Sequence, residues 1–175
     1  LRHNYRFDST KSHWTQAHLK WLRSLTLDGL YAEILKEYLL TYDNLVDKLD
    51  RLDKRIEELA AGETYRENVQ KLSCFIGVKT VTALAVLTEV GDFKRFASAQ
   101  HFASYIGLTP GEDSSGDGQK RLGITKAGNA HVRSLLVEAA QCYCRGHIGY
   151  KSHALKARQS VNLPEVIAYA DKANE

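Results

Sequence analysis

The clearest pattern along the chain is a seven-residue repeat of apolar side chains between residues 28 and 61. The repeat advances in alternating steps of three and four residues, through Leu35, Tyr38, Tyr42, Leu45, Leu49, Leu52, Ile56 and Leu59. This spacing keeps a narrow apolar seam on one face of a helix, where a partner helix can cover it. It predicts a coiled-coil helix over 28–61, ending at Ala61–Gly62, that self-associates in parallel or antiparallel fashion. A single amphipathic helix packed on its own domain is the alternative.

The segments on either side of this helix have different patterns. Residues 1–27 are predicted to be a linker from a preceding region, with one short helix that Thr15 caps and that continues through Leu25. Residues 62–175 contain short apolar runs broken by glycine, which predict a compact multi-helix domain. The stretch 109–123 holds four glycines and one of the two prolines, and is predicted to be a loop. No stretch alternates convincingly, so the expected fold class is all-α, with helices near 63–74, 80–90, 97–106, 126–145, 151–160 and 164–173.

Composition narrows the class of protein. The 175 residues are 43% hydrophobic and 26% charged, as in soluble globular domains, which excludes global disorder. No run of 18 apolar residues is present, so we expect no membrane span, and no secretory signal occurs within this stretch. Three cysteines cannot build a disulfide framework, which favours a reducing compartment. The chain has no methionine, so we expect it to be a piece of a longer protein.

The net charge of +3 conceals an uneven distribution. Residues 28–61 hold nine acidic against five basic side chains, whereas residues 118–158 hold eight Lys or Arg against Glu138 alone. A basic stripe of this kind is typical of a surface that contacts a polyanion such as nucleic acid. A solvated basic face without a partner is the alternative.

Residues 74–86, CFIGVKTVTALAV, resemble a helix-hairpin-helix motif. In that motif a tight turn and the start of the next helix present backbone N–H groups to a phosphate. The second glycine of the motif is replaced here by Lys79, whose ammonium group can reach a phosphate instead. An ordinary corner between two helices is the alternative.

The glycine-rich stretch contains two adjacent serines, Ser114 and Ser115, followed by Lys120, Arg121, Lys126 and Arg133. A serine hydroxyl beside cations has the chemistry needed to attack a phosphodiester, because the cations stabilise the charge that develops on phosphorus. No histidine is near in sequence to act as a base. From chemistry alone, a flexible surface loop is the favoured interpretation.

Other metal-binding or catalytic patterns are weak. Cys142, Cys144, His147 and His153 are capable of binding zinc, but the two cysteines point to opposite sides if the helix continues, so core packing is favoured. His101 and His131 are interpreted as structural or surface residues. The acids Asp92, Glu112, Asp113 and Asp117 have no recognisable two-metal spacing, and we predict no metal site in this chain.

Four sequence blocks together resemble the C-terminal transposase domain of the Piv/MooV group, the insertion-sequence transposases of the "one-ten" type and their DNA-invertase relatives. The blocks are LxxxxGVKxxTA, TEVGDFKRFASAQHFASYIGLTP, EDSSG and RLGITKAGNAHVRSLLVEAA. The segments WTQAHLKWLRSL, with Tyr5 before it, and DxLDxRIEELA are similar to the middle region of that family. The resemblance covers residues 5–173.

The resemblance implies a function and a set of partners. It implies a DNA recombinase with an N-terminal RuvC-like domain that binds Mg²⁺, then a coiled coil, then this domain. Members are guided by a structured bridge RNA, act in the bacterial or archaeal cytoplasm at the nucleoid, and carry a nucleophilic serine in an S-[ST]-G motif. Ser114 matches that serine, with Ser115 as the fallback. Lys79, Lys120, Arg121, Lys126 and Arg133 are then the expected nucleic-acid-binding residues, and this chain alone is expected to bind weakly and to cut nothing.

Two other functions stay open at this point. The chain is alternatively a non-catalytic module that binds nucleic acid and dimerises, or a coiled-coil interaction protein with no role in nucleic-acid binding. Loss of recombination on replacing Ser114 separates the first of these from an enzyme, and salt-sensitive binding separates the second.

Overall fold

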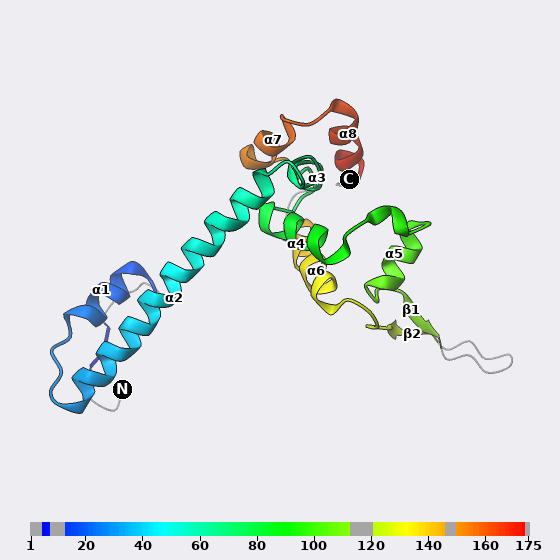
Figure 1. Ribbon diagram of the computed structural model, residues 1–175. Helices are drawn as coiled ribbons and strands as arrows, with labels where there is room; N and C mark the ends of the chain where they lie inside the picture. The colour runs from blue at the N-terminus through cyan, green and yellow to red at the C-terminus, as the bar shows by residue number, and fades with distance from the viewer. Residues whose placement is uncertain (1–4, 8–12, 113–120, 146–149, 174–175) are drawn as a thin grey trace. The chain divides into compact units, whose positions relative to one another are not determined.

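The computed structural model describes residues 5–7, 13–112, 121–145 and 150–173 (Figure 1). The described part is mostly helical, which confirms the expected fold class, and it divides into two compact units, residues 1–52 and 53–175. No helix in the described part is both long enough and apolar enough to cross a membrane. The elements in chain order are α1 (Gln16–Ser24), α2 (Leu30–Ala61), α3 (Arg66–Leu72), α4 (Thr80–Val90), the 3₁₀ turn η1 (Phe93–Arg95), α5 (Ala99–Tyr105), β1 (Pro110–Glu112), β2 (Arg121–Ile124), α6 (Ala130–Arg145), α7 (His153–Gln159) and α8 (Pro164–Ala173).

The first unit begins with a small aromatic cluster around α1. Thr15 caps the helix as predicted, because its side chain accepts a hydrogen bond from the His18 backbone. The His18 ring is buried and lies 5.0 Å from Phe7 and 5.6 Å from Trp21, measured between ring centroids. Its Nδ1 accepts a hydrogen bond from the backbone N–H of Trp14, which holds Trp14 in a left-handed backbone conformation. The turn before α1 is therefore fixed by one histidine.

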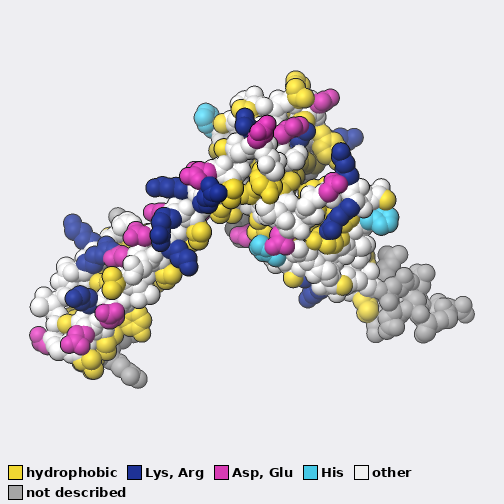
Figure 2. Space-filling model, viewed as in Figure 1, with side chains coloured by type: hydrophobic (Ala, Val, Ile, Leu, Met, Phe, Trp, Pro, Cys, Tyr) yellow, Lys and Arg dark blue, Asp and Glu magenta, His cyan; other side chains and the backbone are white. Residues whose placement is uncertain are grey.

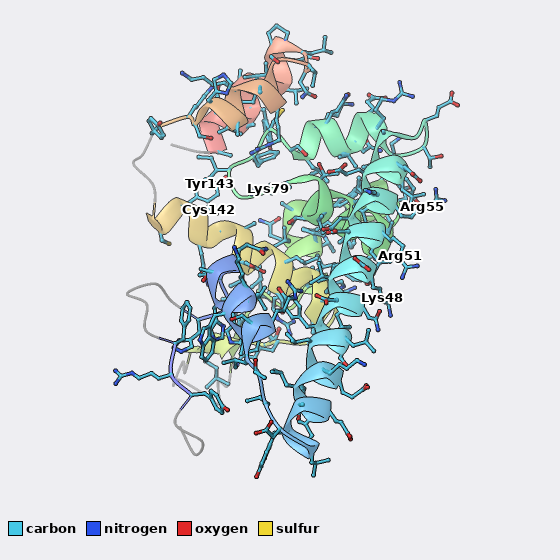
Figure 3. The ribbon with its side chains drawn as sticks, turned by 90° about the vertical axis from the view of Figure 1, so that its left-hand side faces the viewer. Lys48, Arg51, Arg55, Lys79, Cys142 and Tyr143 are labelled. Atoms are coloured by element: carbon cyan, nitrogen blue, oxygen red, sulfur yellow. The ribbon has the colours of Figure 1, made fainter. Side chains whose placement is uncertain are left out.

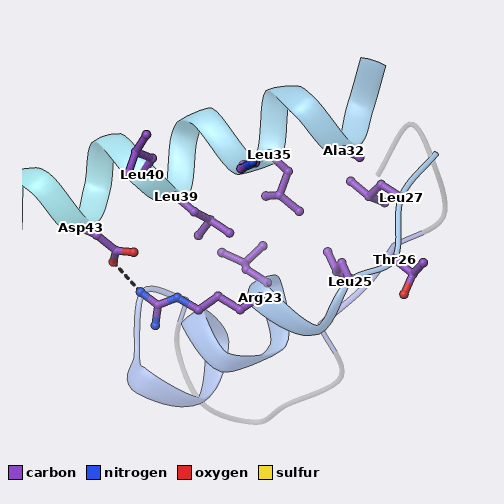
Figure 4. Close-up of a pocket in the computed structure, with 11 residues that line it drawn as sticks. Arg23, Leu25, Thr26, Leu27, Ala32, Leu35, Leu39, Leu40 and Asp43 are labelled. Carbon is purple, nitrogen blue, oxygen red and sulfur yellow. Dashed lines mark hydrogen bonds and ion pairs between the residues drawn. The ribbon is translucent and has the colours of Figure 1, made fainter. Parts of the chain in front are cut away.

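The second feature of this unit is an open groove between α1 and the first half of α2 (Figure 4). The groove has a volume of about 560 Å³ and is lined mainly by leucines. An ion pair between Arg23 of α1 and Asp43 of α2 closes one side of it. α1 thus covers only one flank of the longer helix.

The predicted helix over 28–61 is confirmed as α2, but its apolar seam is largely uncovered in the isolated chain. Leu45, Leu49 and Leu52 are 56%, 59% and 49% exposed, and Tyr38 is 72% exposed. Figure 2 shows basic and acidic side chains along the same helix. Exposed leucines at successive seam positions are unusual on a helix that folds against its own domain.

The second unit is built around α4, which is buried on two faces. Ala83, Leu84 and Leu87 pack with Ala60 and Val69, from the end of α2 and from α3. The opposite face, Val86 and Val90, packs with Ile106 and Val132, at the end of α5 and in α6. An apolar sequence without a polar face, TVTALAVLTEV, forms a helix here because both sides are covered.

The stretch 109–123, predicted to be a loop, begins and ends as a short antiparallel hairpin. Pro110 of β1 pairs with Ile124 of β2, and Glu112 pairs with Arg121, with an irregularity between the two pairs. The strands are too short for alternation to register in the sequence, and Leu122 and Ile124 are both exposed. β1 and β2 are the only strands in the described residues.

Candidate nucleic-acid interface

The turn between α3 and α4 is held against α6 by a glycine. Gly77 has φ +80, and a Cβ placed on it would lie 2.1 Å from the carbonyl oxygen of Ala139. The Tyr143 side chain of α6 hydrogen-bonds the backbone of Ile76 in the same turn, and burial is the main reason that the pKa of Tyr143 is raised. A tight turn therefore joins α3 and α4, as both the motif and an ordinary corner require, and main-chain contact fixes its position on α6.

The N-terminus of α4 is open for a ligand that accepts hydrogen bonds. Lys79 occupies the N-cap position in an extended conformation, and its side chain makes no capping hydrogen bond. The first turn of α4 contains no acidic residue, and both Lys79 and Val81 are exposed. Figure 3 labels Lys79 and Tyr143, the α6 side chain that hydrogen-bonds the turn. Free N–H groups, the helix dipole and one ammonium group together favour an anion.

Two further glycines, Gly107 and Gly128, fix the base of the β-hairpin. Gly107 has φ +71 and Gly128 has φ +89, and Cβ atoms on them would lie 2.0 Å from the carbonyl oxygens of Ala127 and Tyr105. The segment after α5 and the segment before α6 thus touch through their main chains. Lys126 N–H donates to Gly107 O at 3.1 Å across the same contact.

The predicted site residues divide into those outside the described residues, those near the β-hairpin, and Lys79. Ser114, Ser115 and Lys120 lie outside the described residues, and Arg121 lies in β2. Lys126 is exposed, with a left-handed backbone at φ +56. Arg133 is half-buried and donates from Nη1 to Ile106 O at 2.8 Å, so it also ties α6 to the end of α5. The structure brings Lys126 and Arg133 to the same place, residues 106–107, whereas Lys79 lies at the start of α4.

A polar cluster beside this junction was missed by the sequence analysis. Glu89 accepts hydrogen bonds from His131 Nδ1 and from Asn129 Nδ2, each at 3.0 Å. The Asn129 amide also lies 3.4 Å from the Tyr105 hydroxyl, and the Arg95 guanidinium stacks over the Tyr105 ring at 4.5 Å. The hydrogen bond from His131, and then that from Asn129, lowers the pKa of the Glu89 carboxyl.

This cluster changes the interpretation of His131 and of the start of α6. The sequence favours a structural or surface role for His131, and the structure gives it a carboxylate partner 42 positions earlier in the chain. Asn129 caps α6, because its Oδ1 accepts from Val132 N–H, and this delays the start of that helix to Ala130. Glu89 and His131 both lie in the sequence blocks that carry the family resemblance, and that resemblance was the available signal. Their pairing depends on the packing of α4 against α6.

The cysteines form no recognisable site in the described residues. Cys142 and Cys144 are exposed on α6, whereas Cys74 is buried after α3, where burial raises the pKa of its thiol. His147, proposed with them as a zinc ligand, lies outside the described residues.

Comparison with known proteins gives a consistent result. The family model described as "Transposase IS116/IS110/IS902 family" matches residues 69–155. The chain is 33% identical over 180 residues to the transposase for insertion sequence element IS1533 of Leptospira borgpetersenii, covering 99% of this chain and 50% of that protein. It is 34% identical over 111 residues to the transposase for insertion sequence element IS1111A of Coxiella burnetii, covering 63% of this chain and 30% of that protein.

A DNA-inverting protein is also among the similar proteins. The pilin gene-inverting protein of Moraxella lacunata is 33% identical over 123 residues, which cover 65% of this chain and 38% of that protein. The chain therefore spans between 30% and 50% of the length of these three relatives.

Proposed function

Because the chain belongs to the IS116/IS110/IS902 family of transposases, we propose that it supplies the serine nucleophile and part of the nucleic-acid surface of a DNA recombinase. Ser114 is the proposed nucleophile and Ser115 is the fallback. The partners of the reaction are DNA and a structured bridge RNA, and the reaction takes place in the cytoplasm at the nucleoid. The family match over residues 69–155 carries this proposal, because it includes both the α3–α4 turn and the serine segment.

The proposed reaction conserves a phosphodiester bond. The serine Oγ attacks a DNA phosphorus, an Oγ–P bond forms, and the bond from phosphorus to one deoxyribose oxygen breaks. That oxygen leaves as a hydroxyl, having gained one proton in place of the proton lost by the serine. Rejoining reverses these steps with a deoxyribose hydroxyl from the other strand, so no external energy source is required.

The geometry around the hairpin supports the charge requirements of this reaction. The strands that lead into and out of the serine segment are fixed by the Gly107 and Gly128 contacts, and Lys126 is exposed at that junction. Lys120 and Arg121 follow the serines directly in the sequence. Cations on a preorganised scaffold stabilise a phosphorane more effectively than mobile ones, because no reorganisation is needed during the reaction.

The metal chemistry belongs to another part of the proposed enzyme. The described residues bring together no group of three or more His, Cys, Asp or Glu that fits a metal ion, so we derive no step through a metal in this chain. The family resemblance assigns Mg²⁺ to an RuvC-like domain in the full-length protein. We therefore expect this chain alone to bind nucleic acid weakly and not to cut it.

The test uses the full-length enzyme with Ser114→Ala, and Ser115→Ala as the matched control. We expect the first variant to lose recombination of a donor and a target plasmid, and to lose the covalent protein–DNA adduct seen on a denaturing gel, while it still binds DNA. The second variant should retain both. Loss in Ser115→Ala alone would transfer the role to the fallback residue, and unchanged recombination in both variants would favour the non-catalytic binding module.

We also propose that α2 joins two copies of the chain through its exposed seam. The charges that flank the seam favour a parallel pair. Lys48, Arg51 and Arg55 follow one flank of the helix, as Figure 3 shows, whereas Asp50, Asp53 and Glu57 follow the other by helical spacing. In a parallel pair each basic flank faces an acidic one, and Lys48 faces Asp53 of the second copy. In an antiparallel pair, like charges face each other.

Disulfide trapping tests this arrangement. In a background with Cys142 and Cys144 replaced by serine, Leu52→Cys should form a covalent dimer under mild oxidation, because equivalent seam positions meet in a parallel pair. Lys54→Cys, on the outer side of α2, is the control and should stay monomeric. A dimer that forms in solution but is not trapped through Leu52→Cys would support the antiparallel arrangement.

A further inference from the structure

The C-terminal helices supply hydrogen bonds to the end of α3. The last carbonyl groups of an α-helix have no partner within that helix. Here Gln70 O accepts from Asn162 Nδ2 at 3.3 Å, Ser73 O from Arg158 Nε at 3.1 Å, and Cys74 O from Gln159 Nε2 at 3.1 Å. The donors lie 85 to 92 positions later in the chain. Side chains of α7 and the residues after it therefore cap α3 from outside.

Gln159 is the most constrained of these three donors. Its side chain is only 3% exposed, and both protons of its amide are used. One is donated to Cys74 O and the other to Asp171 Oδ1 of α8 at 3.0 Å. Asp171 forms an ion pair with Lys151, and the hydrogen bond from Lys151 keeps the pKa of the Asp171 carboxyl below its ordinary value. A charged acceptor therefore orients the buried amide.

The bonded carbonyl lies directly before the turn that leads into α4. Only Phe75 and Ile76 separate Cys74 from Gly77, and Gly77 is pressed against Ala139 of α6. The turn is thus fixed on one side by α6 and on the other by Gln159. Lys79 and the free N–H groups of α4 follow within a few residues.

We infer that Gln159 is a positioning residue that sets the direction in which the α3–α4 turn presents Lys79 and the N-terminus of α4 to a phosphate. The inference rests on the proposed nucleic-acid contact. It gives α7 and α8 a role in binding, although neither helix carries a predicted contact residue.

The experiment is a double-mutant cycle on this chain, using fluorescence anisotropy with a labelled DNA duplex at two salt concentrations. Lys79→Ala should weaken binding about three- to tenfold and reduce the salt dependence by about one counterion. Gln159→Leu should weaken binding by a similar factor, although it removes no charge. Adding Lys79→Ala to Gln159→Leu should then have little further effect, because the lysine is already misdirected.

Two controls separate positioning from general destabilisation. Gln100→Leu, on the exposed surface of α5, should leave binding unchanged, and urea unfolding should show the variants folded at the assay temperature. If Gln159→Leu does not fold, Asp171→Ala replaces it, because that change removes the acceptor that orients Gln159, together with the ion pair to Lys151, and leaves the Gln159 amide itself in place. A folded Gln159→Leu or Asp171→Ala variant in which Lys79→Ala keeps its full effect would overturn the inference.

Failure of the proposed contact itself has a different signature. In that case the unmodified chain shows no salt-sensitive binding, or Lys79→Ala alone has no effect, whatever residue stands at position 159.

Discussion

Two sets of leucines, one in each compact unit of the chain, differ in their exposure. In residues 1–52, Leu45, Leu49 and Leu52 follow one seam of α2 and remain about half exposed. In residues 53–175, Leu84 and Leu87 lie on α4 and are 6% and 7% exposed, within a cluster that joins three helices. The first set has the stronger sequence period, and the second set has the better packing.

The periodicity of apolar residues in the sequence and their burial in the structure are therefore separate properties. A strict seven-residue period places apolar side chains on one line, but it does not supply the surface that covers them. α4 has almost no polar face, and its two sides are covered by neighbours from its own unit. The second unit therefore packs its core with its own helices, whereas Leu45, Leu49 and Leu52 of α2 stay exposed, as the proposed pairing of two chains requires.

The largest expected effect concerns the main-chain contacts of the second unit. Gly77→Ala should destabilise the chain by about 3 kcal/mol or more, because the new Cβ meets a backbone carbonyl that cannot rotate away. Urea unfolding followed by circular dichroism measures the loss.

Gly91→Ala is the matched control for this change. Gly91 also has a positive φ, +70 with ψ −114, but a Cβ on it meets nothing within 4 Å. We expect a cost of about 2 kcal/mol from backbone strain alone, smaller than the loss in Gly77→Ala. Equal losses in the two variants would show that the contact with Ala139 does not hold the turn.

A pair of leucine substitutions tests the comparison directly. Leu84→Ala should cost about 3 kcal/mol of unfolding free energy, because it opens a cavity in the core of the second unit. Leu49→Ala should change the unfolding of the dilute monomer by less than about 0.5 kcal/mol, because the side chain is already exposed.

The same two variants should reverse their order when self-association is measured. Sedimentation equilibrium should show weaker dimerisation for Leu49→Ala and unchanged dimerisation for folded Leu84→Ala. A large loss of monomer stability in Leu49→Ala would mean that the seam is covered within one chain.

The smallest expected effect depends on pH. The pKa of Asp171 is lowered from 3.8 in the folded chain, chiefly by the hydrogen bond from Lys151, so the unfolded chain binds more protons in acid. The stability that this group contributes is complete above pH 3.8 and is lost as the pH falls through the lowered folded value. Asp171→Asn should therefore be less stable than the unmodified chain near neutral pH, with a gap that closes in acid. A gap independent of pH would assign the effect to packing.

The fold was largely predictable where the signals are local. The capping residue Thr15, the end of α2 at Ala61, the start of α4 at Thr80 and the proline at the start of α8 were all identified from the sequence and are confirmed. The β1–β2 hairpin was not predicted, because strands of three and four residues are too short to show a period.

The candidate site was less predictable because its contacts join distant segments. Lys79 was found from a local motif, and the structure places it at the N-cap of α4. The pairs Glu89–His131 and Gln159–Cys74 are separated by 42 and 85 residues, and no local pattern links their members. The role of Arg133 in holding Ile106 O is of the same kind, since charge alone marked it as a phosphate ligand.

The glycine contacts at residues 107 and 128 also bear on how the protein can change over time. Because Gly107 and Gly128 meet their neighbours through main-chain atoms, substitutions that change only side chains elsewhere between these two glycines are expected to leave the framework in place.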